Sequence, residues 1–157
     1  MDLTEFDLTG RVALVTGGGT GIGRATALLL AERGADVAVA GRRAEPLEKT
    51  AGDIAALGRR GLAVPCDVRK PEAVRAMVAE VVARFGRLDI LVNNAGGAHG
   101  HIGLARMDLA KWDRDIQLNL SAAQYCSQAA LPHLKRSKGN IVNISSLAAV
   151  ASAGGLT

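Results

Sequence analysis

The sequence predicts an α/β protein built on a doubly wound parallel sheet, in a chain of 157 residues. Three observations lead to this prediction. Short apolar runs alternate with longer amphipathic stretches, a glycine-rich turn follows the first apolar run, and no repeat or linker interrupts the alternation. Strands that are almost entirely apolar indicate a parallel sheet covered on both faces, and right-handed crossovers between them give the doubly wound arrangement.

The first half of the chain predicts three strands and two helices. A strand over 11–17 is stopped by glycines, and the helix over 21–34 closes on Gly34, a common stop at a helix C-terminus. A second strand follows over 36–41. The helix over 44–58 is amphipathic, with Leu47, Ile54 and Leu57 on one side. A third strand is expected over 61–68.

The second half continues the same alternation. A helix over 70–86 has Pro71 in its first turn, and a fourth strand follows over 88–96. After a loop over 98–107, Asp108 is expected to cap a long helix that reaches residue 134, with Pro132 late enough to kink or shorten its last turn. The fifth strand, over 140–145, has no following helix to cover its second face. The predicted sheet is therefore truncated after this strand.

Composition excludes several classes of protein. Hydrophobic residues make up 48% of the chain and charged residues 22%, which is typical of a globular domain. The net charge of +4 is spread along the chain, which argues against nucleic-acid binding. No apolar run approaches the roughly 20 residues of a membrane span, and the acidic N-terminus is no signal peptide, so we expect a cytoplasmic protein without a membrane partner. Cys66 and Cys126 are expected to be reduced core thiols. His99 and His101 lack a third ligand, so no metal site is expected.

The turn between the first strand and the first helix carries the clearest functional pattern. It reads TGGGTGIG over 16–23, where a nucleotide-binding fold places its phosphate loop. Glycines let the backbone approach a pyrophosphate, and the free N–H groups of the helix N-terminus attract the negative charge. A glycine-rich turn that is merely tight is the alternative.

The spacing TGxxxGxG resembles that of the short-chain dehydrogenase/reductase family. Further motifs follow in the order of that family: CDV after the third strand, NNAG after the fourth, an asparagine within IQLNL, and NISS at the end of the fifth. The resemblance covers essentially the whole chain. It implies one NAD(P)-binding Rossmann domain over 1–157, in an oxidoreductase that interconverts a ketone and a secondary alcohol. It also implies a small carbonyl or alcohol substrate, such as a 3-oxoacyl thioester, a sugar or a steroid, and a homo-oligomeric full-length form.

The resemblance assigns cofactor-binding residues in three places. Asp67 resembles the residue that binds the adenine amino group, with Val68 beside the ring, although a helix cap or turn residue would look the same. Asn94 resembles the cofactor-contacting member of NNAG, whereas Asn93 is expected to tie neighbouring strands together. The remaining residues belong to the phosphate loop and to NNAG: Gly17, Gly18, Gly19, Thr20, Gly21, Ile22, Gly23, Ala95 and Gly96.

Two catalytic residues are implied. Ser146 resembles the serine that polarises the substrate carbonyl, and a turn serine bonded to its own backbone is the alternative. Asn119 resembles an asparagine that kinks the long helix and holds a water molecule in a proton relay. Asparagine is a poor residue for a helix interior, which favours a special purpose, although an amide bonded only to backbone would also explain it.

The end of the second strand predicts the type of nucleotide. An acidic residue there would bind a ribose 2′-hydroxyl, whereas an arginine accommodates a 2′-phosphate. The chain reads VAGRR, with no acid before Glu45. Arg42 is therefore expected to bind the 2′-phosphate of NADP, with NAD as the alternative cofactor and a solvated arginine as the alternative role.

The family resemblance also implies a tyrosine and, four residues later, a lysine that together handle the substrate proton. By the family spacing from Ser146 they would fall beyond Thr157, and Tyr125 on the long helix has no lysine at the right distance. We therefore expect the chain to be an N-terminal portion of a reductase, inactive and poorly stable alone. A catalytically silent nucleotide-binding module or an inert fragment is the alternative.

Overall fold

The computed structural model describes residues 6–97 and 106–147. Strands and helices alternate, as the apolar periodicity predicts. The elements are β1 (Val12–Thr16), α1 (Gly21–Glu32), β2 (Asp36–Gly41), α2 (Ala44–Ala56), β3 (Gly61–Pro65), α3 (Pro71–Phe85), β4 (Ile90–Asn93), α4 (Leu109–Ile116), η3 (Gln117–Ser121), α5 (Ala122–Ser137) and β5 (Asn140–Asn143).

The five strands in the described residues form one parallel sheet in the order β3-β2-β1-β4-β5. The chain first winds outward from β1 to β3, then returns to place β4 on the other side of β1. This change of direction makes the sheet doubly wound and confirms the predicted α/β, Rossmann-type fold class.

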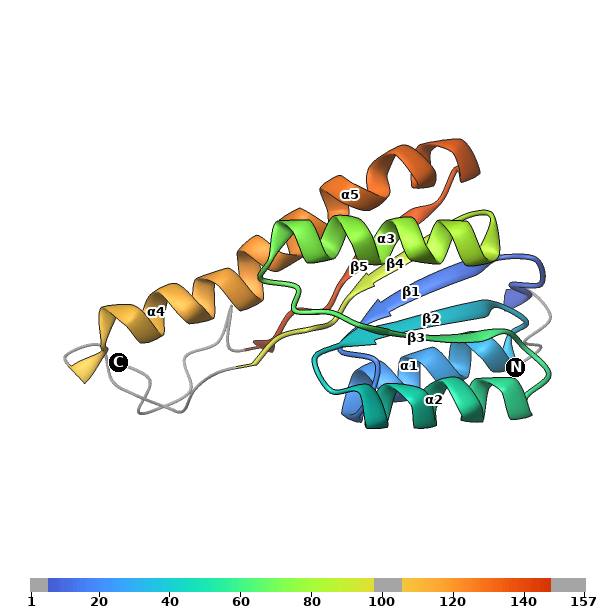
Figure 1. Ribbon diagram of the computed structural model, residues 1–157, viewed down its shortest axis with the longest axis horizontal. Helices are drawn as coiled ribbons and strands as arrows, with labels where there is room; N and C mark the ends of the chain where they lie inside the picture. Colours follow the sequence, from blue (N-terminus) through green and yellow to red (C-terminus); the bar gives the residue numbers. More distant parts are fainter. Residues whose placement is uncertain (1–5, 98–105, 148–157) are drawn as a thin grey trace.

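Helices cover the sheet on both faces. α1 and α2 lie on one face, and α3 and α5 lie on the other (Figure 1). Side chains of β1 alternate between the two layers, because successive residues of a strand point to opposite faces. Val12 and Leu14 join the cluster with α3 and α5, whereas Ala13 and Val15 join the cluster with α1 and α2. The two buried clusters fix the sheet between its helices.

The long helix differs from the prediction in one respect. Asp108 caps it as expected, since its side chain accepts a hydrogen bond from the backbone N–H of Ala110 at 3.1 Å. The helix is not uniform, because a π-helical turn, η3, separates α4 from α5. Pro132 does not shorten the last turn, since α5 continues to Ser137. Figure 1 shows α4 extending beyond the sheet.

β5 lies at an edge of the sheet, and all four of its residues are exposed. Ile141 is 37% exposed, Val142 45% and Ile144, just after the strand, 42%. This agrees with the expectation that the last strand lacks cover on one face. Within the described residues, none of the helices is both long enough and apolar enough to cross a membrane.

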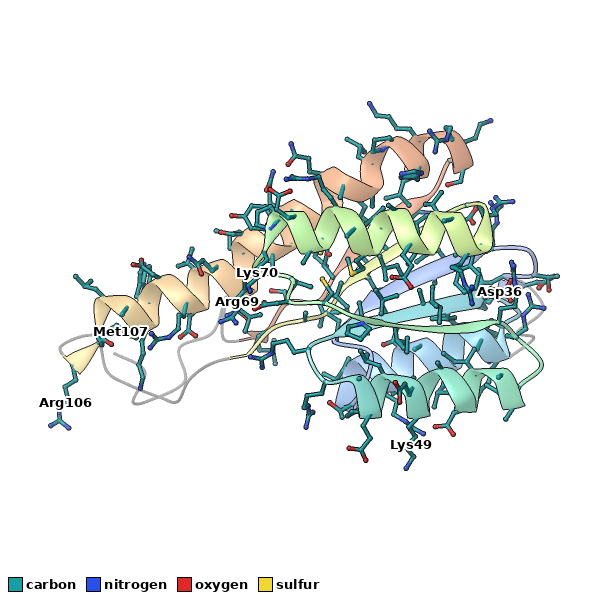
Figure 2. The ribbon with its side chains drawn as sticks, viewed as in Figure 1. Asp36, Lys49, Arg69, Lys70, Arg106 and Met107 are labelled. Atoms are coloured by element: carbon teal, nitrogen blue, oxygen red, sulfur yellow. The ribbon has the colours of Figure 1, made fainter. Side chains whose placement is uncertain are left out.

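The amino ends of the strands are held by two buried carboxylates. Asp89 accepts hydrogen bonds from the side chains of Arg11 and Arg87 and from the backbone N–H of Val12. Burial alone would raise the pKa of Asp89, but these donors together lower it. Asp36, at the opposite end of the sheet from Arg69 and Lys70 in Figure 2, accepts from Arg60 and also has a lowered pKa, although burial acts against it.

Candidate functional site

The carboxyl ends of β1 and β4 form the point where the winding of the sheet reverses. In doubly wound sheets the loops that leave such neighbouring strands diverge, and the crevice between them is the usual ligand site. Here those loops are the glycine-rich turn after β1 and residues 94–97 after β4. Most of the residues predicted from the motifs lie on this edge.

The glycine-rich turn has the geometry that its residues require. Gly17 and Gly21 adopt φ angles of +67° and +54°, a region that favours glycine. A side chain at Gly23 would collide with the carbonyl oxygen of Gly17 and the amide of Asn94. The start of α1 therefore packs directly against Gly17 and against Asn94, which follows β4. The side chain of Thr20 does not cap the start of α1. The N–H groups in the first turn of α1 therefore have no hydrogen-bond acceptor from that side chain.

Thr16, the last residue of β1, and Asn94, which follows β4, brace this turn. The Thr16 hydroxyl accepts hydrogen bonds from the backbone N–H groups of Asn94 and Ala95, both at 3.0 Å, and donates to the carbonyl of Val92. The Asn94 amide donates to the carbonyl of Thr16 at 2.9 Å and to that of Gly17 at 3.4 Å. These contacts give Asn94 a structural role, and its predicted contact with a cofactor stays a prediction. Thr16 opens the predicted glycine-rich motif, but the motif alone did not indicate this bracing role.

Asn93 ties neighbouring elements together, as predicted. Its amide donates to the side chain of Asn143 on β5 at 2.9 Å and to the hydroxyl of Ser127 on α5 at 3.1 Å. Ile144 extends the pairing past β5, because its N–H donates to the carbonyl of Asn93. The chain that leads to Ser146 is thus aligned with the end of β4.

Asp67 lies in the turn between β3 and α3, and Arg69 holds its carboxylate. The side chain of Arg69 donates to both carboxylate oxygens, at 2.9 Å and 2.7 Å. The hydrogen bonds from Arg69 hold the pKa of Asp67 at about 2. Val68 is buried, at 4% exposure. No motif singled out Arg69, since an arginine two residues after an aspartate is common on surfaces.

Arg42 follows β2, next to the turn that carries Asp67. The two segments are joined because the N–H of Cys66 donates to the carbonyl of Gly41 at 2.7 Å. Arg42 is exposed, and its charge contributes to the lowered pKa of Asp67. Figure 2 shows Arg69 and Lys70 at the start of α3, on the side of the carboxyl ends of the strands. Basic residues therefore surround one carboxylate on this part of the edge.

Asn119 lies within η3 and connects it to the segment after β4. Its amide donates to the carbonyl of Gly97 at 2.8 Å, and its oxygen accepts from the N–H of Gly97 at 2.9 Å. It also donates to the carbonyl of Asp115 at 2.9 Å, a carbonyl of the turn before it. Gly96 must stay small, because a side chain there would come within 2.9 Å of the Asn119 oxygen. The predicted water relay is untested, and the contacts seen go to backbone.

The remaining candidate residues fall in different places. Ser146 is exposed and follows β5, on the side of the sheet where the strands have their carboxyl ends. His99 and His101 lie outside the described residues. Tyr125 contributes to a groove of ≈ 660 Å³ between α3 and α5, which is lined by residues of those helices rather than by the predicted site residues. In the part of the chain that the structure describes, no group of His, Cys, Asp and Glu side chains is arranged to hold a metal ion.

The two cysteines are free and buried, as predicted. Burial raises the pKa of Cys66 to about 11 and that of Cys126 to about 12. Both thiols are therefore neutral near pH 7.

A doubly wound sheet with a braced glycine turn at its switch point is typical of dinucleotide-binding proteins. A comparison with protein families identifies the family within this class. The model of the short chain dehydrogenase family matches residues 11–157, and the chain belongs to that family.

Individual relatives are similar over most of this chain. The cis-4-hydroxycyclohexanecarboxylate dehydrogenase of Sinomonas cyclohexanicum is 44% identical over 138 residues, which are 87% of this chain and 55% of the relative. The 3-oxoacyl-(acyl-carrier-protein) reductase FabG of Staphylococcus aureus (strain Mu50) is 44% identical over 138 residues, 86% of this chain and 55% of the relative. The chain thus spans about half the length of these curated relatives.

A solved structure shows the same fold. The 7α-hydroxysteroid dehydrogenase complexed with NADH and 7-oxo glycochenodeoxycholic acid superposes with a TM-score of 0.92 at 30% identity. The match covers 99% of this chain and 61% of that one.

Proposed function

We propose that the chain forms the nucleotide-binding part of an NADP-dependent oxidoreductase that interconverts a ketone and a secondary alcohol. The observation that carries the proposal is the glycine turn at the β1–β4 switch point, braced by Thr16 and Asn94. Such a turn brings backbone N–H groups close to a pyrophosphate. When bound, the cofactor supplies the hydride, and the protein binds and orients it.

The proposed contacts with the cofactor divide into three parts. The pyrophosphate lies over the glycine turn and the start of α1, the adenine lies beside Asp67 and Val68, and the segment over 94–96 faces the nicotinamide half. Family membership and the NADH bound to the related hydroxysteroid dehydrogenase support a nicotinamide dinucleotide. The substrate is a small carbonyl or alcohol compound, by analogy with the named relatives.

The preference for NADP rests on the end of β2. Arg42 is exposed there, and no acidic residue stands between Gly41 and α2 to bind a ribose 2′-hydroxyl. The related hydroxysteroid dehydrogenase holds NADH, so this preference is argued from the residues of this chain and not from that relative.

Titration of NADP and NAD against wild type and Arg42→Ala tests the preference. A charge-assisted hydrogen bond is worth about 1.5–3 kcal/mol, so the variant should lose roughly tenfold or more in affinity for NADP and little for NAD. Arg43→Ala is the matched control, because Arg43 is the exposed neighbour of Arg42. An equal loss for both nucleotides in Arg42→Ala would remove the argument for NADP.

For the reaction itself, we propose that Ser146 polarises the substrate carbonyl and that Asn119 holds a water molecule in the proton relay. In the whole protein, Ser146→Ala and Asn119→Ala should lower kcat more than they lower nucleotide affinity, because these roles are exercised in the transition state. Unchanged turnover in both variants would show that the two residues are structural.

We also propose a cytoplasmic homo-oligomer. The two free, buried thiols support a reducing compartment. Large apolar side chains exposed on α4 support self-association: Leu109, Trp112 and Ile116. Sedimentation of the whole protein measures its oligomeric state, and a monomer at micromolar concentration would contradict this part of the proposal.

A further inference from the structure

Arg69 and Asp67 form a rigid unit in the turn that follows β3. The backbone N–H and the Nε of Arg69 donate to Oδ1 of Asp67 at 3.1 Å and 2.9 Å, and its Nη2 donates to Oδ2 at 2.7 Å. This planar, two-pronged contact fixes the orientation of a carboxylate far better than a single bond does. The N–H of Lys70 closes the turn on the carbonyl of Asp67 at 3.0 Å.

The contact leaves one part of the carboxylate open. An ionised carboxylate offers about four acceptor positions. Arg69 takes two positions on Oδ1 and one on Oδ2, and no other donor to the Asp67 side chain is found among the described residues. The Asp67 side chain is 20% exposed, so a ligand can reach it. One acceptor position on Oδ2 therefore remains for a donor such as an exocyclic amino group.

Arg69 also determines whether the neighbouring arginine, Arg42, pairs with Asp67. Arg42 starts from the adjacent strand end and is close enough for its charge to act on Asp67. The ion pair of Asp67 is nevertheless with Arg69, and no ion pair of Arg42 is found in the described part of the chain. Without Arg69, the unpaired carboxylate would attract Arg42 and draw it away from an anionic ligand.

We infer that Arg69 is a positioning residue of the nucleotide site. It fixes Asp67 so that one oxygen accepts the adenine amino group, and it neutralises that carboxylate so that Arg42 stays available to a 2′-phosphate. The inference rests on the proposed function, because it requires that Asp67 faces adenine. It adds a residue that shapes both the choice of base and the choice of phosphate without touching either.

The test compares nucleotides that differ at only one group. Titration calorimetry measures the affinities of NADP, NAD and the NADP analogue with hypoxanthine in place of adenine, which carries an oxygen where adenine carries the amino group. We expect wild type to prefer adenine by about tenfold or more. Arg69→Ala should shrink that preference by about fivefold and should also shrink the preference for NADP over NAD. Each preference is a ratio within one variant, so a general loss of folded protein does not imitate the effect.

Three further variants complete the design. Arg75→Ala removes an exposed arginine of α3 that pairs with Glu72, and both preferences should stay within about twofold of wild type. Asp67→Asn should abolish the preference for adenine, which tests the acceptor itself. Arg69→Gln removes the charge but keeps a long side chain. It is measured in the same way if thermal melting shows that Arg69→Ala is unfolded.

The outcomes separate the inference from the proposed function. Loss of the adenine preference in Asp67→Asn but not in the Arg69 variants would overturn the inference and leave the site intact. Dinucleotide binding with no effect of either residue on the preference would overturn the inference and the placement of Asp67. Absence of dinucleotide binding to wild type would overturn the proposed function, and the inference with it.

Discussion

β1 and β5 are both short, parallel and rich in apolar residues, but their surroundings are opposite. Every residue of β1 is buried between helices on the two faces of the sheet. Every residue of β5 is exposed, and its pairing is with β4 alone among the described strands. β1 is paired on both sides, with β2 and β4, so the two strands differ in backbone pairing as well as in what covers their side chains.

Backbone pairing and side-chain burial contribute differently to a strand. Pairing fixes the backbone and its register, whereas burial supplies most of the stabilising free energy. The loop after β1 gains from both, since Thr16 and Asn94 hold it from a buried strand. The segment after β5 gains mainly from pairing, through Asn143 and the N–H of Ile144. We therefore expect substitutions in β1 to be costly and equivalent ones in β5 to be cheap.

The largest difference is expected for truncation of apolar side chains. Leu14→Ala in β1 removes a fully buried side chain and should lower the free energy of unfolding by about 2–5 kcal/mol. Ile141→Ala in β5 removes a side chain that is 37% exposed and should cost about 1 kcal/mol or less. Urea unfolding of the 157-residue chain measures both. Equal losses would show that β5 is covered as well as β1.

Polar contacts at the strand ends should differ less. Thr16→Val keeps the shape of a buried side chain but leaves the N–H groups of Asn94 and Ala95 without their acceptor, which should cost about 2 kcal/mol. Asn143→Ala at the end of β5 removes one of several acceptors of the Asn93 amide and should cost about 1 kcal/mol or less. The same unfolding experiment applies. A larger cost for Asn143→Ala would reverse the comparison.

Acid should weaken the amino ends of the inner strands. The folded pKa values of Asp36 and Asp89 lie below the usual range of an aspartate, and that of Asp67, which follows β3 at the other end of the sheet, is about 2. Carboxylates with lowered pKa values stabilise the fold above the unfolded pKa, and this stability is lost as the pH falls through the folded pKa. Unfolding free energy should thus decline as the pH drops from about 4 towards 2.

Asp89→Asn isolates the part of this pH dependence that belongs to β1 and β4. It should cost about 1 kcal/mol at pH 7, because its arginine partners are half exposed and screened, and it should make the acid decline shallower. β5 itself, Asn140–Asn143, carries no acidic residue and should not contribute. An acid decline of unchanged steepness in Asp89→Asn would contradict this assignment.

The smallest effect on stability is expected for a charge on β5. Val142→Lys places a lysine on an exposed edge strand and should change the free energy of unfolding by less than about 0.5 kcal/mol. It should lower self-association of the 157-residue chain, since charged edge strands resist pairing with other chains. Light scattering measures this, with Ala55→Lys on the exposed side of α2 as the control of equal charge. Equal effects of the two lysines would show that net charge alone is responsible.

Most of the fold was predictable because its signals are local. The apolar runs and the stop at Gly34 lead directly to β1, α1 and β2, and Gly34 has the expected positive φ of +97°. The end of β3 at Pro65 was not predictable, because Cys66 and Val68 beyond it are apolar and remain buried in the core. The π-helical form of η3 was not predictable either: the family resemblance implied only a kink at Asn119, and a helix with one extra residue keeps nearly the same apolar period.

The candidate site was predictable only where a motif marks it. The glycine turn, Asp67 and Asn119 stand out by residue type and position. Thr16 and Arg69 act through partners that the fold brings to them, and a sequence does not say which donors meet which acceptors. The functions of the motif residues remain predictions, whereas the structure shows which residues contact them.

The π-helical turn has a consequence for how this segment tolerates insertions and deletions. Each residue of an α-helix advances the chain by about 100°. Deleting one residue from Gln117–Ser121 would restore a uniform helix, but it would rotate α4 by that angle relative to α5 and detach Asn119 from Gly97. The length of η3 is therefore constrained as tightly as its sequence. Alignments with relatives should place no single-residue gap here, and a homologue that lacks the extra residue should have rebuilt the contact with the chain after β4.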